Sequence, residues 1–336
     1  MNGQHAMDEM RLTGSSKALA LLNGSNNTEN GDRAPEVDRQ LAEERTHADN
    51  TVSHIYESGF KHGNFSDINV QIGTTVYRLH ALILSKSPFL VHLMSISPFK
   101  GMIYMPIDQY PDVTLEAMAM TLGYLYSYQA SRSLSQANAR AVLASACLLG
   151  GLDDLCERAY ATCKDSIRVD TIEEWLAWID AHPSPLAHSP SASAVSTPRS
   201  PSPQSSQEGP GPSIYGPYAQ LLRNDVLDFL VVSLPTTLLT ENESNKSEAT
   251  AEATEALLRI FSRVSFDIFK SAMESPNFVI GSDHDRFRFA KAAIARRKQF
   301  AGRGAEESVV LAVGEGKGNV HITRKLRRKA LWKVAK

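Results

Sequence analysis

Cysteine is scarce in this 336-residue chain, which contains only Cys147, Cys156 and Cys163. None of the three forms a C-x-x-C pair, and no histidines cluster at the spacing of metal ligands. The sequence therefore predicts neither a disulfide framework nor a zinc site. We expect three reduced thiols packed on helices.

The sequence also has no long apolar run. Its longest apolar segments, such as residues 229–234, are far too short to cross a bilayer. Residues 1–30 have no basic stretch followed by an apolar run, the pattern of a secretory signal. We therefore expect an intracellular protein, in the cytoplasm and/or the nucleus, without a membrane partner.

Catalytic motifs are lacking as well: there is no nucleophile elbow, dinucleotide fingerprint or pair of catalytic carboxylates. His284 lies between two aspartates, but neighbouring side chains do not point to a common centre, so a helix start near residues 281–283 is favoured over a metal site. Residues 314–318 lack the full phosphate-loop pattern and are predicted to be the turn of a β-hairpin. We expect no enzyme and no cofactor.

Three stretches contain few large apolar side chains and are predicted to be disordered: residues 1–50, 183–213 and 241–250. The second has 8 Pro and 10 Ser among its 31 residues, a composition that resists both helix and sheet. These breaks leave three parts to fold, at residues 52–180, 214–300 and 301–336.

Residues 67–79 carry the clearest local pattern. Polar and apolar residues alternate over 67–72, Gly73-Thr74 offers a two-residue turn, and 75–79 are rich in strand formers. This predicts a hairpin with one buried face. Ser87 followed by Pro88 predicts the start of a helix that ends near Ser95.

Further elements follow in order: a strand at residues 103–107, an apolar helical stripe over 115–125, and two helices at 136–149 and 152–167 separated by Gly150-Gly151. A sheet early in the chain with helices stacked on it is an α+β arrangement.

These residues resemble the BTB/POZ signature. Its elements here are Phe65-Ser66-Asp67-Ile68-x-Val70, Tyr77-x-Leu79-His80 and Leu84-x-x-Ser87-x-Phe89. The resemblance covers about a third of the chain, from Phe60 to Ile167. The signature residues are predicted to be structural; they are Phe65, Asp67, His80, Leu84, Ser87 and Phe89.

The continuation resembles the post-BTB helices, similar to a BACK region, of long fungal BTB proteins. The matching stretches are residues 172–176, 215–219, 234–235 and 285–291. The resemblance implies a small sheet with helical hairpins, then an all-α BACK-like region and a C-terminal β-hairpin. Residues 183–213 would then be an insertion within the helical region.

The resemblance also implies function: such domains lack catalytic chemistry, and they dimerise or bind partners. Some members hold substrates on a cullin-3 ubiquitin ligase. This chain departs from the pattern at Ala81, where many members carry Lys or Arg, and at 98–102, which lack the hydrophobic-x-Glu pattern of cullin binding. The candidate partner surface comprises Leu93, Met94, Phe99, Ile103 and Tyr104.

Two further segments suggest regulation. Ser/Thr-Pro pairs in the insertion make Thr197, Ser200 and Ser202 candidate phosphosites. Residues 286–336 hold 15 Lys and Arg against 3 Glu, and within them the candidate nuclear-import signal consists of Arg324, Lys325, Arg327, Arg328 and Lys329. Direct nucleic-acid binding is not favoured.

The sequence thus predicts a non-enzymatic scaffold or adaptor that binds proteins, as a homodimer or on a cullin. The alternative hypothesis is a nuclear transcriptional cofactor controlled by phosphorylation of the insertion.

Overall fold

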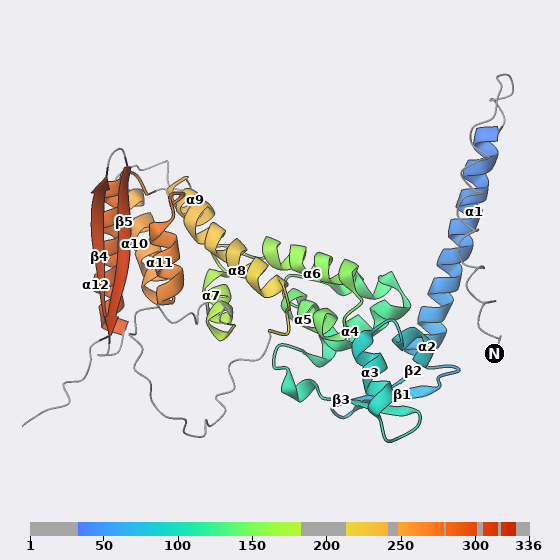
Figure 1. Ribbon diagram of the computed structural model, residues 1–336. Helices are drawn as coiled ribbons and strands as arrows, with labels where there is room; N and C mark the ends of the chain where they lie inside the picture. Colours follow the sequence, from blue (N-terminus) through green and yellow to red (C-terminus); the bar gives the residue numbers. More distant parts are fainter. Residues whose placement is uncertain are drawn as a thin grey trace, which may run out of the picture. The chain divides into compact units, whose positions relative to one another are not determined.

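The computed structural model describes residues 33–182, 213–240, 248–278, 280–300, 305–314 and 317–326 (Figure 1). The chain divides into two compact units, at residues 1–57 and 58–336. We describe each unit by itself.

The first unit contains the long helix α1 (Arg33–His54), which continues into the π-helical turn η1 (Ile55–Lys61) across the unit boundary. The prediction of disorder for residues 1–50 is therefore wrong over residues 33–50, and residues 1–32 lie outside the described part. Residues 33–50 contain no Gly or Ser, and 11 of these 18 residues are Glu, Arg, Gln, Ala or Leu, which are strong helix formers. Arg39 and Glu43 add an ion pair at helical spacing, 3.3 Å apart.

The second unit begins with a three-stranded sheet in the order β2-β1-β3. Strand β1 (Ile68–Ile72) pairs antiparallel with β2 (Thr75–Leu79) and parallel with β3 (Met102–Met105). Gly73 at φ 56° makes the tight turn of the hairpin. Burial alternates along β1 and β3, so the predicted hairpin with one buried face is confirmed.

After the short helix α2 (Ala81–Leu84), helix α3 (Pro88–Ile96) begins where the sequence predicted. The Ser87 hydroxyl accepts from the Leu90 amide at 3.2 Å and donates to the Leu149 carbonyl at 2.5 Å. Its side chain is completely buried, so one hydroxyl both caps α3 and connects it to α5.

Helical elements follow the sheet and pack on one another, α4 on α5 and α5 on α6. They are η2 (Ile107–Gln109), α4 (Leu115–Tyr126), η3 (Tyr128–Ser133), α5 (Ala139–Leu149) and α6 (Asp153–Asp165). Val70, Leu79 and Met105 from the sheet and Met118 and Leu143 from the helices are all 0% exposed. The α+β fold class is confirmed, and the predicted helices at 136–149 and 152–167 start slightly later than expected.

The remaining elements are helical until a final hairpin. They are α7 (Ile172–Ala181), α8 (Tyr218–Asp228), η5 (Phe229–Ser233), α9 (Leu234–Thr240), α10 (Glu248–Arg263), α11 (Phe266–Glu274), α12 (Asp283–Phe300), β4 (Ala305–Gly314) and β5 (Lys317–Leu326). We call residues 58–165 the sheet-containing half and residues 172–326 the helical half. The π turn η5 lies one residue before Leu234-Pro235, and it is explained by Pro235, which has no N–H for the regular helical bond.

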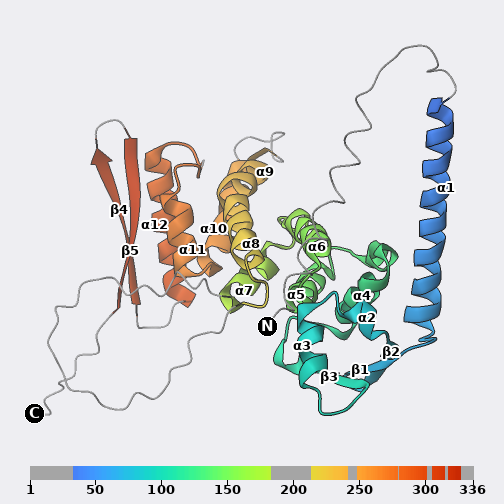
Figure 2. The ribbon, with the colours of Figure 1, turned by 45° about the vertical axis from the view of Figure 1, so that its right-hand side comes forward.

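Strands β4 and β5 form an antiparallel hairpin from Ala305↔Leu326 to Gly314↔Lys317, which packs against α11 and α12 (Figure 2). The predicted β-hairpin agrees with this pairing, in which Gly314, Lys317 and Gly318 belong to the strands, and residues 315–316 lie outside the described part. The apolar and β-rich stretches 309–313 and 319–323, which the sequence offers as the strands, are shorter than β4 and β5.

The two halves of this unit meet at Tyr215, which is 0% exposed. Its ring packs edge-on against Trp178 and His182, with centroids 5.1 and 5.3 Å away, and its hydroxyl accepts from Trp178 Nε1 at 3.3 Å. His182 reaches the sheet-containing half, with Nε2 2.8 Å from Asp112 Oδ2. We call Asp112, Trp178, His182 and Tyr215 the Tyr215 joint.

The His182 ring lies between two acceptors, because Nδ1 is 2.8 Å from the Trp178 carbonyl oxygen and Nε2 faces the Asp112 carboxylate. This arrangement suits the doubly protonated ring. The hydrogen bond with Asp112 is the main reason that the pKa of His182 is raised above 6.5, against the lowering effects of burial and of Arg140. A raised pKa stabilises the fold below pH 6.5, and this contribution is lost as the pH rises through the folded-state pKa.

Asp112→Asn is expected to lower the free energy of unfolding by about 1 kcal/mol in acid, because it removes the charge partner of a partly buried imidazolium. The difference from wild type, measured by urea unfolding, should shrink as the pH rises above 6.5 and through the raised pKa of His182. Asp170→Asn is the control, since Asp170 pairs only with the exposed Arg168, at 3.6 Å. A difference that stays constant with pH would contradict the role given to His182.

A buried ion pair fixes the C-terminal hairpin to the helical half. Arg297 of α12 contacts Glu307 of β4, Nε to Oε2 at 2.8 Å, and their side chains are 8% and 7% exposed. The Arg297 guanidinium also donates to the carbonyls of Phe261 and Val264 and lies over the ring of Phe269 at 4.7 Å. One side chain thereby joins α10, α11, α12 and β4.

Arg297→Met is expected to lower the free energy of unfolding by about 3–5 kcal/mol, because it leaves the Glu307 carboxylate buried without its partner. Adding Glu307→Leu should recover only part of this loss, since two carbonyls still lack their donor. The matched control is Arg296→Met, which breaks the exposed pair with Glu255 and should leave the unfolding midpoint near that of wild type. Equal losses in the two arginine variants would refute the assignment.

Candidate protein-interaction surfaces

Asp67 and His80 both satisfy backbone groups. The Asp67 Oδ1 accepts from the Ala81 amide at 2.8 Å, and His80 Nε2 lies 2.9 Å from the Asn64 carbonyl oxygen. The Tyr126 hydroxyl accepts from the His80 amide at 2.9 Å and lies 3.0 Å from His80 Nδ1. This network requires the proton of the ring on Nε2, with the Tyr126 hydroxyl donating to Nδ1.

Tyr126 is the part of this network that the sequence did not reveal, because it lies 46 residues from His80. Burial raises the pKa of Tyr126 to about 12, so it keeps its proton. Among the other signature residues, Leu84 and Ser87 are completely buried and Phe89 is half-buried.

Phe65 differs from the other signature residues. Its side chain is 95% exposed, and its backbone has φ 59°, a left-handed conformation that costs a non-glycine residue about 1–2 kcal/mol. Leu82 of α2 is also 83% exposed. The described contacts therefore give no stabilising reason for a large apolar side chain at position 65.

A cleft opens between α3 and β3, with a volume of about 250 Å³. Its apolar lining includes Ile68, Met94 and Phe99, and the exposed Asp67 and Lys100 contribute opposite charges. Phe99 is 69% exposed at the cleft. We call this feature the α3–β3 cleft.

The candidate partner surface does not form one patch. Ile103 is only 2% exposed and its side chain lies on the buried face of β3, but it lines the α3–β3 cleft together with Met94 and Phe99. Tyr104, the next residue, is 50% exposed on the opposite face. Met94 and Phe99 line the cleft, and Leu93 is half-buried on α3.

A second surface is the outer face of the sheet. The register places Val76, Gln71 and Tyr104 in one row and Arg78, Asn69 and Met102 in the next. Val76 is 52% exposed and Met102 37%, so this face carries apolar side chains among polar ones. The sequence of β1 alone does not predict this face, because its outward residues Asn69 and Gln71 are polar. The apolar side chains come from β2 and β3, and the strand pairing brings them beside β1.

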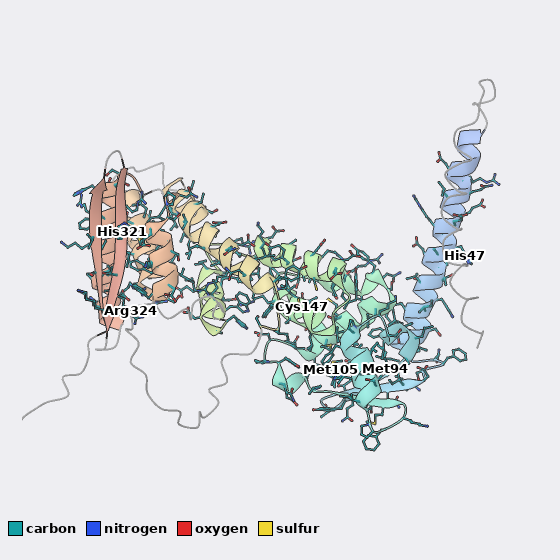
Figure 3. All side chains as sticks on the ribbon, in the orientation of Figure 1. His47, Met94, Met105, Cys147, His321 and Arg324 are labelled. Atoms are coloured by element: carbon teal, nitrogen blue, oxygen red, sulfur yellow. The ribbon has the colours of Figure 1, made fainter. Side chains whose placement is uncertain are left out.

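The basic end is described only in part. Arg324 and Lys325 are exposed on β5, and the Arg324 guanidinium lies 5.4 Å from the centroid of the Phe266 ring (Figure 3). Arg327, Arg328 and Lys329 lie outside the described residues. So do the candidate phosphosites Thr197, Ser200 and Ser202.

His284 lies in the first turn of α12, as the predicted helix start requires. The Ser282 hydroxyl and the Ser282 amide both donate to Asp285 Oδ2, at 2.7 and 3.0 Å, and these two hydrogen bonds lower the pKa of Asp285. The same hydroxyl accepts from the Asp285 amide at 3.2 Å. Within the described ranges, no three His, Cys, Asp or Glu side chains are grouped to hold a metal ion. Nor is any helix there both long and apolar enough to cross a membrane.

Comparison with known proteins finds two relatives of note. BTB/POZ domain-containing protein 2 of Schizosaccharomyces pombe is 27% identical over 297 residues, covering 84% of this chain and 90% of that protein. Human Germ cell-less protein-like 2 is 27% identical over 122 residues, which are 36% of this chain but only 23% of the human protein. No family model matches the chain.

Phe65→Gly tests whether the exposed ring is retained for contact and not for stability. Glycine adopts positive φ without strain, so the free energy of unfolding should stay constant or rise by up to about 1 kcal/mol. Chemical unfolding of the purified full chain would measure it. Phe89→Gly, within α3, is the contrasting change and should be clearly destabilising. A comparable loss at position 65 would show that the ring stabilises the fold after all.

Proposed function

We propose that this BTB/POZ domain protein acts as a non-enzymatic scaffold or adaptor that brings protein partners together. The observation that carries the proposal is the α3–β3 cleft beside the exposed Phe99. At about 250 Å³ the cleft is smaller than most small-molecule sites and suits one or two side chains of a protein partner.

The chemistry of the cleft indicates what such a partner presents. An apolar side chain would be buried against Ile68, Met94 and Phe99, and a polar or charged flank would face Asp67 and Lys100. Burial of the partner's apolar side chain would supply most of the binding free energy. The charges of Asp67 and Lys100 would favour one orientation of the partner.

Self-association uses a different surface in this proposal. Phe65 and Leu82 are the two most exposed large apolar side chains of the described residues. A second copy that covers Phe65 would compensate for the cost of its left-handed backbone. Homodimerisation would then leave the cleft open for another protein.

The cullin-adaptor form of this function requires the partner at the cleft or at residues 98–102 to be a cullin. Ala81 lines the cleft where a basic residue would otherwise stand, so its charge balance differs from the pattern that the resemblance implies. The alternative, a nuclear transcriptional cofactor regulated by phosphorylation, is favoured by the exposed Arg324 and Lys325 on β5.

Cross-linked affinity purification of the full chain, with mass spectrometry, tests the proposal. Phe99→Ala should lose the partner of the cleft by about tenfold or more, the size expected for an interface hot spot. Tyr104→Ala tests the outer face of the sheet separately. Leu221→Ala, on α8, changes a side chain that is 42% exposed and is the matched control.

A cullin that is recovered with wild type and lost with Phe99→Ala would support the adaptor. Recovery of the chain itself with nuclear proteins, and no cullin, would favour the cofactor. If the protein is strictly monomeric and all four samples recover the same proteins, the scaffold proposal fails.

A further inference from the structure

Two of the three cysteines lie side by side although they are on different helices. Cys147 is near the end of α5 and Cys156 is in the first turns of α6, and their sulfur atoms are 3.8 Å apart. The short connection through Gly150 and Gly151 holds the two helices antiparallel. Cys147 is half-buried and Cys156 is 5% exposed, so a small reagent reaches Cys147 first (Figure 3).

We propose that Cys147 and Cys156 are an oxidation site at which a hydroperoxide converts the two thiols into a disulfide. The bond requires the sulfur atoms to approach from 3.8 Å to about 2.05 Å, a movement within reach of side-chain rotation on two helices already in contact. This inference does not depend on the proposed scaffold function.

The surroundings assign different roles to the two sulfurs. The Cys156 thiol hydrogen-bonds to Cys147 and lowers the pKa of Cys147. The same bond, burial and the nearby Asp153 and Glu157 raise the pKa of Cys156. Cys147 is therefore the attacking thiolate, and Cys156 is the resolving thiol.

The reaction has two steps. The Cys147 thiolate attacks one peroxide oxygen, the O–O bond breaks, and the leaving oxygen takes a proton from water, which yields a sulfenic acid and an alcohol or water. The Cys156 thiol then gives up its proton, its sulfur attacks the sulfenic sulfur, and the S–O bond breaks with release of water. Two electrons pass from the thiols to the peroxide.

Oxidation would also alter the Tyr215 joint. The Cys147 sulfur lies 3.7 Å from the Tyr215 carbonyl oxygen, to which the reduced thiol donates. A disulfide has no proton to donate, so this hydrogen bond between α5 and Tyr215, which precedes α8, is lost. Oxidation of Cys147 would therefore change a contact at the Tyr215 joint, where the two halves meet.

The experiment treats the reduced full chain with hydrogen peroxide, blocks the remaining thiols, digests without reductant and maps the peptides by mass spectrometry. The expected product contains a Cys147–Cys156 disulfide and is two hydrogen atoms lighter than the same segment with both thiols reduced; with trypsin both cysteines lie on one peptide, residues 141–158. In the native protein, an alkylating reagent should modify Cys147 several-fold faster than Cys156.

Cys163→Ser is the matched control. Cys163 lies on the same helix as Cys156 but is 0% exposed, and burial raises its pKa to about 12, so this variant should form the same disulfide as wild type. Cys156→Ser should instead accumulate a Cys147 sulfenic acid that a dimedone reagent captures. The proposal is overturned if Cys147 is oxidised in wild type without linkage to Cys156, or if the linkage includes Cys163.

Discussion

The buried ring of Tyr215 is the contact on which the arrangement of the helical half depends. Its neighbours come from three separate segments: Cys147 from α5, Trp178 and His182 from the end of α7, and, through His182, Asp112 before α4. A completely buried aromatic ring brings a large apolar contribution, and its hydroxyl is satisfied by the Trp178 indole N–H. The contact between Asp112 and His182 joins the C-terminal end of α7 to the segment before α4. The Tyr215 ring, the titratable Asp112–His182 pair and the proposed oxidation site at Cys147 therefore lie next to one another.

The interaction surfaces follow from a different constraint, the period of two along each strand. Because Val70, Ile72, Ile103 and Met105 must face the helices, the residues between them must face outward. The alternation alone therefore places Tyr104 and Met102 at the surface, without reference to any partner. Helix α3 contacts β3, an edge strand of this sheet, so the cleft between them lies at the sheet edge. Met102 lines the cleft and also belongs to the outer face, so the two surfaces adjoin at this residue.

Local patterns predicted the hairpin, the Ser87 cap and the helix start at residue 283, because each depends on residues within a few positions of one another. Contacts between distant residues could not be predicted in this way. His80 and Tyr126 are 46 residues apart, and Asp112 and His182 are 70 apart. No spacing rule connects such positions, so only the folded chain brings them together. The alternation that predicted the sheet also places residues 103 and 104 on opposite faces, so Ile103 lines the cleft while Tyr104 is exposed on the outer face. The error at α1 had another origin: averaging over residues 1–50 combined a Gly- and Asn-rich segment with a helix-forming one.

The Tyr215 joint also bears on the Ser/Pro insertion. The chain leaves the described region at His182 and re-enters it at Ser213, and the rings of His182 and Tyr215 are 5.3 Å apart. Both ends of the insertion are therefore fixed at one place by buried contacts, as the insertion hypothesis requires and as a linker between separate domains would not. The entropic cost of closing a loop grows only with the logarithm of its length, about 0.6 kcal/mol for each doubling. The length of the insertion can thus vary at little cost to the helices around it.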